Sequence, residues 1–430
     1  MKSKSQILLL LILLALPVVL TAQVNKSYQV AAWPEFRNCA VTYTFDDWSS
    51  GQYSKAVPVF DSFGYKATFF VVSGWVGNWT PLQNTAKAGH EIANHTATHP
   101  NFNSLSTEQQ ETEIKTCSNL IDSKISDQTC VTMAYPYCVK GNDALHRKYF
   151  IAARGCQGFI EPSTPGDIMN VSSIICGELG AVKTTAQFKA KADQAAVSKG
   201  WLVYLIHGID NDGGYSPLPS DTLKASLQYL KDNDSKFWVT TFANAAKYVR
   251  ERNCVSVEES AVSADSLLVS VNDTLSNNVV FNYPLTIRRI LPAGWQNVKI
   301  IQNNTPVNHS LVEVSAVQYI QFNVIPDSGS IIILNDKTTG VNQLSNPIQN
   351  RLKTWITNNE ICFSVPESCG AEASVSIYDL KGSRVFKSSQ FKSTGVIGSV
   401  SRDVLKKQGI YVIVLSDNKK SWTERIALTR

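Results

Sequence analysis

Strand-like and helix-like segments alternate through the first part of this 430-residue chain, from about residue 38 to residue 254. Short apolar runs rich in β-branched and aromatic residues predict strands, and apolar residues spaced by three and four predict helices between them. The predicted strands are Ala40–Phe45, Ala67–Val72, Glu91–Asn94, Val131–Ala134, Tyr149–Ala153, Trp201–Ile206 and Phe237–Thr241. Such alternation favours a parallel sheet or barrel with outer helices, in which the active site lies at the carboxyl ends of the strands.

The clearest predicted helix begins at Ser106. Gln109 stands three residues later, which is the spacing of a capping box. Apolar residues spaced mostly by three and four then follow, which predicts one buried side: Ile114, Cys117, Leu120, Ile121 and Ile125.

The character of the sequence changes after Cys254. Residues 255–266 are polar and short-chained, which predicts a linker. Only strand signals follow as far as Asn335: Leu267–Val271, Val279–Tyr283, Leu285–Ile290, Val298–Gln302, Tyr319–Val324 and Ile331–Leu334. We therefore expect a small β-sandwich over residues 267–336. A second polar segment, Lys337–Asn350, predicts another linker, and residues 351–430 again contain only strand and turn signals.

The N-terminus has the pattern of an export signal. Lys2 and Lys4 precede an apolar run from Ile7 to Leu20, and Ala22 is a small residue at the expected cleavage point. We predict a secretory signal peptide over residues 1–22 and a mature chain that is secreted or held at the cell surface, with no membrane span. An uncleaved anchor is the alternative, although this run is short for a spanning helix. Removal of Lys2 and Lys4 with the signal peptide lowers the formal net charge from +5 to +3, which is too small to argue for a nucleic-acid partner.

Nine cysteines in an exported protein allow disulfides and leave one cysteine over. Cys39 opens the first strand and Cys254 closes the first domain, so these two are a candidate pair. Cys362 and Cys369 are a second candidate pair across a short loop. The connectivity does not follow from the sequence.

Two adjacent carboxylates, Asp46 and Asp47, follow the first predicted strand. Neighbouring residues on a strand point to opposite sides, so the two side chains can serve different partners. Carboxylates this close raise each other's pKa unless a cation separates their roles. A solvated turn is the alternative, because Asp is common in turns.

Histidines 95 and 99 follow the predicted strand Glu91–Asn94. Four residues apart, they would lie on the same side of a helical turn, and two neutral imidazoles with one carboxylate form a frequent set for zinc or another divalent ion. With such an ion, one aspartate becomes a ligand and the other remains free as a base. Two unrelated histidines are the alternative reading of this pair.

His207 and Arg154 also stand at strand ends. The ordinary pKa of histidine, near 6.5, suits His207 for proton donation to a leaving group, although it can equally be a structural residue. A buried arginine requires an anion, and the free aspartate is the available partner for Arg154.

Together these motifs resemble the polysaccharide deacetylases of carbohydrate esterase family 4, which are also called NodB-homology domains. Thr44-Phe45-Asp46-Asp47 matches the first motif of that family, and His95-Thr96-Ala97-Thr98-His99 matches the second. Leu205-Ile206-His207 matches the fifth, and Ala134-Tyr135-Pro136-Tyr137 resembles the third. The resemblance covers roughly residues 38–254.

The resemblance implies an α/β fold in which a distorted (β/α) barrel forms a catalytic domain, over residues 30–254 of this chain, and we expect two small all-β domains after it. It implies that Asp46 is the general base and His207 the general acid. Asp47, His95 and His99 would bind a divalent metal ion, with zinc the expected one. The backbone N–H of Tyr137 would help to stabilise the oxyanion.

Two departures from the family pattern affect these expectations. Ala134 stands where many members have the arginine that pairs with the base, and Arg154 is our candidate replacement. Cys138 stands where glycine is usual. The carboxylate that partners the acid histidine has no clear match, and Asp167 and Asp210 are both candidates.

Aromatic residues stand in predicted loops beside these motifs: Trp48, Trp75, Trp79 and Tyr215. Each one alone is readily explained by ordinary packing. As a group beside the site, they favour the binding of sugar rings.

The tail resembles the C-terminal sorting domain of type IX secretion. Ile377-Tyr378-Asp379-Leu380-Lys381-Gly382, then Gly409-Ile410-Tyr411-Val412 and the final Arg425-Ile426-Ala427-Leu428, carry this resemblance. It implies an export route across an outer membrane and the secretion machinery as a partner of residues 351–430. A plain β-sandwich accessory domain is the alternative.

The sequence therefore predicts a secreted, metal-dependent hydrolase that removes acetyl groups from a polysaccharide. The bond would be an N-acetyl amide, as in chitin or peptidoglycan, or an O-acetyl ester, as in xylan. The rival hypothesis is a catalytically inactive glycan-binding surface protein on the same fold, which the two departures support. The intact aspartates and histidines argue against that rival.

Overall fold

The structure is a computed structural model that describes residues 23–303 and 305–337 and, between 352 and 428, the residues in and beside the strands. They fall into two compact units, one reaching to Lys337 and the other within residues 338–430. The predicted signal peptide and residues 338–350 of the predicted second linker lie outside the described residues. Among those described, no helix combines the length and apolarity that a membrane crossing requires.

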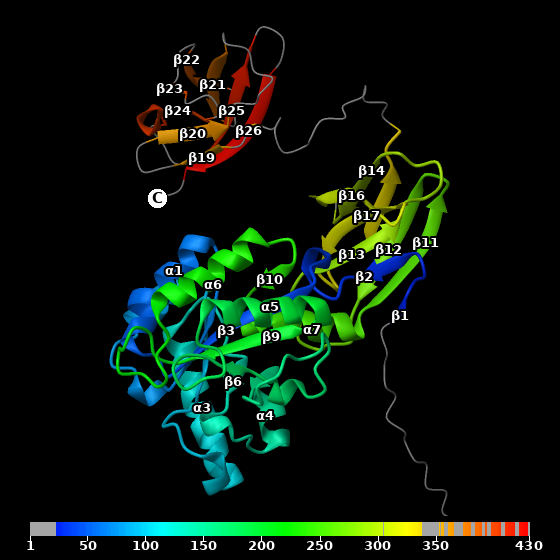
Figure 1. Ribbon diagram of the computed structural model, residues 1–430. Helices are drawn as coiled ribbons and strands as arrows, with labels where there is room; N and C mark the ends of the chain where they lie inside the picture. Colours follow the sequence, from blue (N-terminus) through cyan, green and yellow to red (C-terminus); the bar gives the residue numbers. More distant parts are fainter. Residues whose placement is uncertain are drawn as a thin grey trace, which may run out of the picture. The chain divides into compact units, whose positions relative to one another are not determined.

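A parallel sheet forms the centre of the region between Cys39 and Cys254 in the first unit (Figure 1). Its strands run in the order β7-β6-β5-β4-β3-β9-β8, and β10 pairs with the first half of β3. The strands are β3 (Cys39–Asp46), β4 (Thr68–Val71), β5 (Glu91–Asn94), β6 (Thr132–Ala134), β7 (Ala152–Arg154), β8 (Ile174–Ile175), β9 (Trp201–Ile206) and β10 (Phe237–Val239). The α/β prediction with a curled, barrel-like parallel sheet is therefore confirmed.

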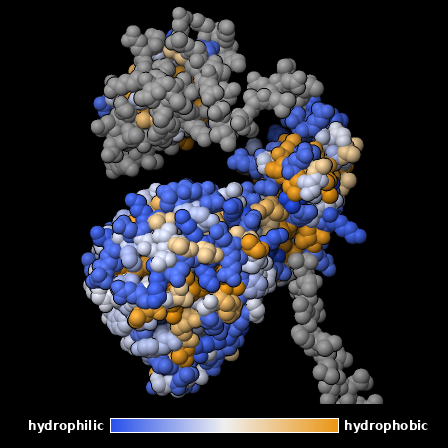
Figure 2. All heavy atoms as spheres, viewed as in Figure 1, coloured by the Kyte–Doolittle hydropathy of each residue, from blue (hydrophilic) through white to orange (hydrophobic). Residues whose placement is uncertain are grey.

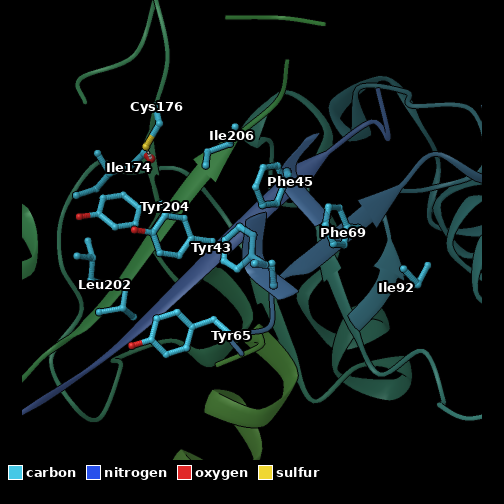
Figure 3. Close-up of a cluster of buried hydrophobic side chains, with 14 of the residues drawn as sticks. Tyr43, Phe45, Tyr65, Phe69, Ile92, Ile174, Cys176, Leu202, Tyr204 and Ile206 are labelled. Carbon is cyan, nitrogen blue, oxygen red and sulfur yellow. Dashed lines mark hydrogen bonds between the residues drawn. The ribbon is translucent and has the colours of Figure 1, made fainter. Parts of the chain in front are cut away.

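Alternation along β3 explains its central place in the sheet. Val41, Tyr43 and Phe45 lie in one apolar cluster, and Ala40, directly before Val41, lies in another on the opposite face. Figure 3 shows the aromatic part of the first cluster, where the Tyr43 ring lies 4.9 Å from that of Tyr204 and stacked Phe45 and Phe69 are 5.0 Å apart. A strand that is buried on both faces fixes the position of the residues at its end.

Helices cover this sheet (Figure 1). They are α1 (Val57–Phe63), α2 (Thr80–Lys87), α3 (Thr107–Lys124), α4 (Asp143–Tyr149), α5 (Thr185–Ser198), α6 (Ser220–Asp232) and α7 (Phe242–Cys254). The predicted capping box of Ser106 and Gln109 is present at the start of α3, whose residues Ile114 and Cys117 are buried. The strand expected at Tyr149–Ala153 is displaced, because Tyr149 ends α4 and β7 begins at Ala152.

Two sheets form a β-sandwich in the same unit, with strand orders β1-β11-β12-β18-β14-β15 and β16-β17-β13-β2. Their strands pair antiparallel, except that β1 runs parallel to β11. Their buried residues share one apolar cluster. The strands are β1 (Gln23–Val24), β2 (Tyr28–Val30), β11 (Ser256–Ser263), β12 (Ser266–Asn272), β13 (Leu285–Ile290), β14 (Val298–Gln302), β15 (Thr305–Pro306), β16 (His309–Val314), β17 (Val317–Val324) and β18 (Ile331–Asn335).

Two sequence predictions in this region are wrong. The segment read as a linker, residues 255–266, contains the strand β11, which pairs with β12 along most of its length. Residues 279–283 form no strand, because the N–H groups of Val280 and Phe281 both donate to the Asn277 carbonyl in a turn. The strand β16 and the N-terminal strands β1 and β2 were not predicted.

Hydrogen bonds join the sandwich to the parallel-sheet region. The Tyr283 N–H donates to the carboxylate of Glu251 on α7, 3.0 Å away, and the Tyr248 hydroxyl donates to the Ala31 carbonyl at 3.0 Å. The visible face of the first unit is largely hydrophilic with smaller apolar groups (Figure 2). The predicted catalytic and sandwich segments thus lie in one compact unit.

The second unit is all-β in its described residues. Its sheets have the orders β19-β20-β24-β23 and β22-β21-β25-β26 around one apolar cluster. The strands are β19 (Thr354–Ile356), β20 (Glu360–Ser364), β21 (Ser374–Asp379), β22 (Arg384–Ser388), β23 (Lys392–Ser393), β24 (Ile397–Ser401), β25 (Gly409–Ser416) and β26 (Ser421–Leu428). Residues 380–382 of the tail motif lie outside the described residues.

Candidate active site

The residues predicted for the site meet in one pocket at the carboxyl ends of the strands. Its volume is about 450 Å³. It is lined by Asp46, Asp47, His95, His99, Tyr135, Tyr137, Cys138, Arg154, Ile175, Leu205, His207 and Tyr215. Parallel strands bring their carboxyl ends to one edge of a sheet, which is why residues up to 169 positions apart line a single pocket.

Asp46, the last residue of β3, forms a buried ion pair with Arg154, the last residue of β7. The distance from Arg154 Nη2 to Asp46 Oδ2 is 2.5 Å, and the two side chains are 1% and 4% exposed. Arg154 Nη1 also donates to Ser173 Oγ at 3.1 Å. Burial disfavours the charged form of Asp46, but the charge of Arg154 and its hydrogen bond to the carboxylate outweigh it and lower the pKa of Asp46 below its ordinary value.

Asp47, His95 and His99 form a cluster suited to a metal ion. One ligand atom from each residue lies within 4.8 Å of the others. Asp47 Oδ1 lies 3.7 Å from His95 Nε2 and 3.9 Å from His99 Nε2. This oxygen is buried and accepts no hydrogen bond from the described residues, so a cation would supply the partner it lacks. A carboxylate oxygen and two imidazole nitrogens fit a divalent ion such as zinc.

Burial shifts the pKa values of His95 and Asp47 in this cluster. It lowers the pKa of His95 to about 4, which leaves the ring neutral, as a ligand must be. Burial, and next the charge of Asp46, raise the pKa of Asp47 to about 6. His95 Nδ1 lies 2.9 Å from the Ala134 carbonyl oxygen, a contact that directs Nε2 toward Asp47.

The histidines do not lie on a helical turn as the sequence predicted. Residues 95–99 form an irregular turn in which Thr96 and His99 have φ of 68° and 62°. The His99 N–H donates to Thr96 Oγ1 at 3.0 Å. Glu113 on α3, which sequence reasoning missed, accepts hydrogen bonds from the N–H groups of Ala97 and Thr98 and from the Thr98 hydroxyl, at 3.0, 2.9 and 2.8 Å.

His207 follows β9 and faces the same pocket. Its Nε2 lies 3.9 Å from Asp46 Oδ2, whereas its buried Nδ1 has no partner among the described residues. Neither carboxylate that we considered reaches this atom. Asp167 instead pairs with Lys140 and Arg147, and Asp210 accepts hydrogen bonds from Ser220.

A buried amide, also missed from the sequence, ties the base strand to the acid strand. Gln52 Nε2 donates to the carbonyl oxygens of Asp46 at 2.6 Å and His207 at 2.9 Å. Asp212 reinforces the link by accepting from Ser49 Oγ at 2.5 Å and from the Gly51 N–H at 2.8 Å. Gln52 begins the short helical segment Gln52–Ala56 that precedes α1, and the sequence carries no signature for its role, because both of its partners are backbone carbonyls.

The turn after β6, residues 135–139, follows Ala134 in the third motif, and we call it the third-motif turn. A disulfide joins its Cys138 to Cys156. The proposed pairing of Cys39 with Cys254 is therefore wrong, since both are free thiols and Cys39 is buried in the core. Cys369, in the other candidate pair, lies outside the described residues. Cys138, which stands where the family usually has glycine, thus has a structural role as one half of a disulfide.

Two of the four aromatic residues named from the sequence border the site. Trp75 is 56% exposed with its ring 5.3 Å from that of His99, and Tyr215 is 51% exposed with its ring 5.0 Å from that of His207. Trp48 and Trp79 instead pack against the apolar core. The exposed rings leave faces on which a sugar could stack.

Comparison with known proteins finds similarity chiefly in the first part of the chain. Residues 35–149 match the model of the polysaccharide deacetylase family. A chitooligosaccharide deacetylase from Rhizobium leguminosarum bv. trifolii is 35% identical over 124 residues, which are 28% of this chain and 55% of that protein. Gellan lyase from Bacillus sp is 23% identical over 347 residues, 76% of this chain and 14% of that protein.

Among solved structures, the Xyl-CE4 domain of a multidomain xylanase from the hindgut metagenome of Trinervitermes trinervoides aligns with 18% identity and a TM-score of 0.36. The alignment covers 48% of this chain and 89% of that domain. The chain spans 14% and 55% of the two relatives above. The family match over residues 35–149, which include Asp46, Asp47, His95, His99 and Tyr137, supports a polysaccharide deacetylase domain in the first unit.

Proposed function

We propose that the first unit is a secreted, metal-dependent hydrolase that removes acetyl groups from a polysaccharide. One observation carries the proposal: the pocket joins an arginine-paired aspartate, a cluster of metal-ligand type and a histidine. The family match supports the reaction class. The substrate would be an N-acetylated glycan of the chitin or peptidoglycan type, or an O-acetylated glycan of the xylan type.

The chain's own residues would divide the work as follows. Asp47, His95 and His99 would hold the ion, which when bound polarises a carbonyl and acidifies water. Asp46, kept ionised by Arg154, would accept the proton of the attacking water, and His207 would donate a proton to the departing amine or alcohol. The N–H of Tyr137 would donate a hydrogen bond to the developing oxyanion.

The test measures acetate release from an N-acetylated chitooligosaccharide and from an acetylated xylan, with zinc supplied. We expect turnover on at least one substrate, loss of activity in Asp46→Asn with metal content unchanged, and loss of bound metal in a His95→Ala/His99→Ala variant. Full metal-dependent activity in Asp46→Asn would contradict the assignment of the base. Metal binding without turnover on either substrate would favour the rival glycan-binding protein.

The two departures that favoured that rival have structural counterparts. Arg154 stands beside Asp46, where the missing third-motif arginine would act, and Cys138 is held in a disulfide. These observations support the catalytic proposal over an inactive site.

We also propose that residues 351–430 direct export across an outer membrane, on the basis of the tail motif. The described strands of this unit are compatible with a small β-domain. Deleting residues 351–430 in a host with type IX secretion should leave the protein inside the cell envelope. Unchanged export of the truncated chain would contradict the proposal.

A further inference from the structure

The turn that presents Tyr137 to the pocket has an unusual backbone. Tyr137 and Cys138 are consecutive non-glycine residues with φ of 54° and 60°. A Cβ atom disfavours this left-handed region, which glycine alone adopts freely. Within the turn, the Cys138 N–H donates to the Tyr135 carbonyl and the Val139 N–H donates to the Pro136 carbonyl, each at 3.1 Å.

Tyr135 and Pro136 anchor the start of the turn in the core, but the two left-handed residues lie at the surface. Tyr137 is 63% exposed, and its ring lies against that of His99 at a centroid distance of 4.6 Å. Cys138 is also exposed. An exposed turn with two left-handed residues therefore requires another constraint if it is to persist.

The disulfide supplies a constraint from a rigid neighbour. Cys138 is bonded to Cys156, whose Cα lies 5.6 Å away and which follows Arg154 by two residues. Between them, the Gly155 N–H donates to the Val171 carbonyl at 2.9 Å, and the Gly155 carbonyl accepts from Ser173 Oγ at 2.7 Å. These two hydrogen bonds fix the backbone at Gly155, next to Cys156.

We propose that the Cys138–Cys156 disulfide is a positioning element of the active site, which holds the third-motif turn left-handed so that the Tyr137 N–H faces the pocket. The disulfide thereby replaces the conformational freedom of the family glycine. It also ties the turn to the segment that carries Arg154, so the oxyanion donor and the partner of the base share one framework. The inference rests on the proposed function, in which that N–H contacts the reacting group.

Two double variants that differ by one methyl group test the proposal: Cys138→Ala/Cys156→Ala and Cys138→Gly/Cys156→Ala. Both lack the disulfide, but only glycine adopts the left-handed turn without cost. We expect kcat to fall about fivefold to thirtyfold in the alanine variant, with KM and metal content unchanged. The glycine variant should keep at least half of the wild-type kcat.

A disulfide that serves only stability would lower the unfolding temperature of both variants without separating their kcat values. Equal kcat in the two variants, whether both high or both low, would therefore overturn the proposal. So would alkylation of both Cys138 and Cys156 in unreduced wild-type protein, because the link would then be absent.

Hydrogen–deuterium exchange over residues 135–139 gives a second readout that needs no turnover. Exchange should be faster in the alanine variant than in the glycine variant, because a relaxed turn loses its two backbone hydrogen bonds. Equal exchange rates would contradict the positioning role. If wild-type protein released no acetate from either glycan, the proposed function would fail while the exchange comparison still decided the inference.

Discussion

Replacing Arg154 with methionine isolates the contribution of the buried ion pair. Methionine keeps much of the side-chain length but removes the guanidinium 2.5 Å from Asp46 Oδ2. Because Asp46 is 4% exposed, the carboxylate would remain buried without its closest cation, and breaking such a pair costs about 3–5 kcal/mol. The hydrogen bond from Arg154 to Ser173 Oγ is also lost. We expect the free energy of unfolding at pH 7 to fall by an amount in that range.

The measurement is urea unfolding of metal-free protein, followed by tryptophan fluorescence. Asp46→Asn alone should also destabilise, since it leaves Arg154 buried without its anion. The double variant Asp46→Asn/Arg154→Met removes both charges, so its loss should be smaller than the sum of the single losses by about 2 kcal/mol or more. Additive losses, or a loss below about 1 kcal/mol in Arg154→Met, would refute the reasoning that the pair is a buried, coupled unit.

Three further predictions concern the metal cluster, the rim of the pocket and the sandwich contact. Glu113→Ala should weaken zinc binding about 10- to 100-fold in a chelator competition, because the carboxylate holds the turn between the two histidines, and an unchanged affinity would argue against that role. Trp75→Ala should raise KM for an oligosaccharide severalfold with kcat unchanged, whereas an unchanged KM would identify the exposed ring as irrelevant to binding. Burial raises the pKa of Glu251 from 4.5 to about 8. Ionisation of this carboxyl group therefore costs the folded state on the order of a few kcal/mol. The free energy of unfolding of the wild type should fall as the pH rises from about 4.5 to about 8. Glu251→Gln should therefore unfold at a higher temperature than wild type at pH 8 and at a similar one at pH 5; equal midpoints at pH 8 would contradict the shift.

The position of the pocket could be predicted from the sequence, because runs of apolar residues show where buried strands end. Asp46, Arg154 and His207 each follow a run of apolar residues that a parallel sheet buries, and the carboxyl ends of such strands share an edge. The contact between Arg154 and Asp46 followed from the same logic, since a buried guanidinium needs an anion and only one carboxylate at that edge was left without a role. No knowledge of the intervening loops was needed.

The supporting residues were out of reach for the opposite reason. Glu113 lies on a helix whose capping box and buried side are predictable, but nothing in its spacing shows that it faces the turn after β5. Gln52, in the helical segment before α1, binds the backbone carbonyls of Asp46 and His207, an arrangement that exists only once the sheet is formed. Side chains that act on backbone atoms far along the chain leave no local pattern.

The linker error has a similar physical cause. The strand β11 (Ser256–Ser263) has only Val257 fully buried, so its sequence lacks the apolar alternation by which strands are recognised. Its partners supply the order: β12 pairs along one edge and the N-terminal β1 along the other. A polar strand is recognisable only when its neighbours in the sheet are known.

The adjacent aspartates were expected to acquire different roles through a cation, but their environments already differ in the protein alone. Arg154 lowers the pKa of Asp46, whereas burial and the charge of Asp46 raise that of Asp47 to about 6. The arginine thus stabilises one carboxylate as an anion, and the buried, unpartnered oxygen of Asp47 is left for a cation to satisfy. The arginine and a bound cation would therefore be complementary: each would neutralise one member of a pair that could not otherwise carry two charges in a buried pocket.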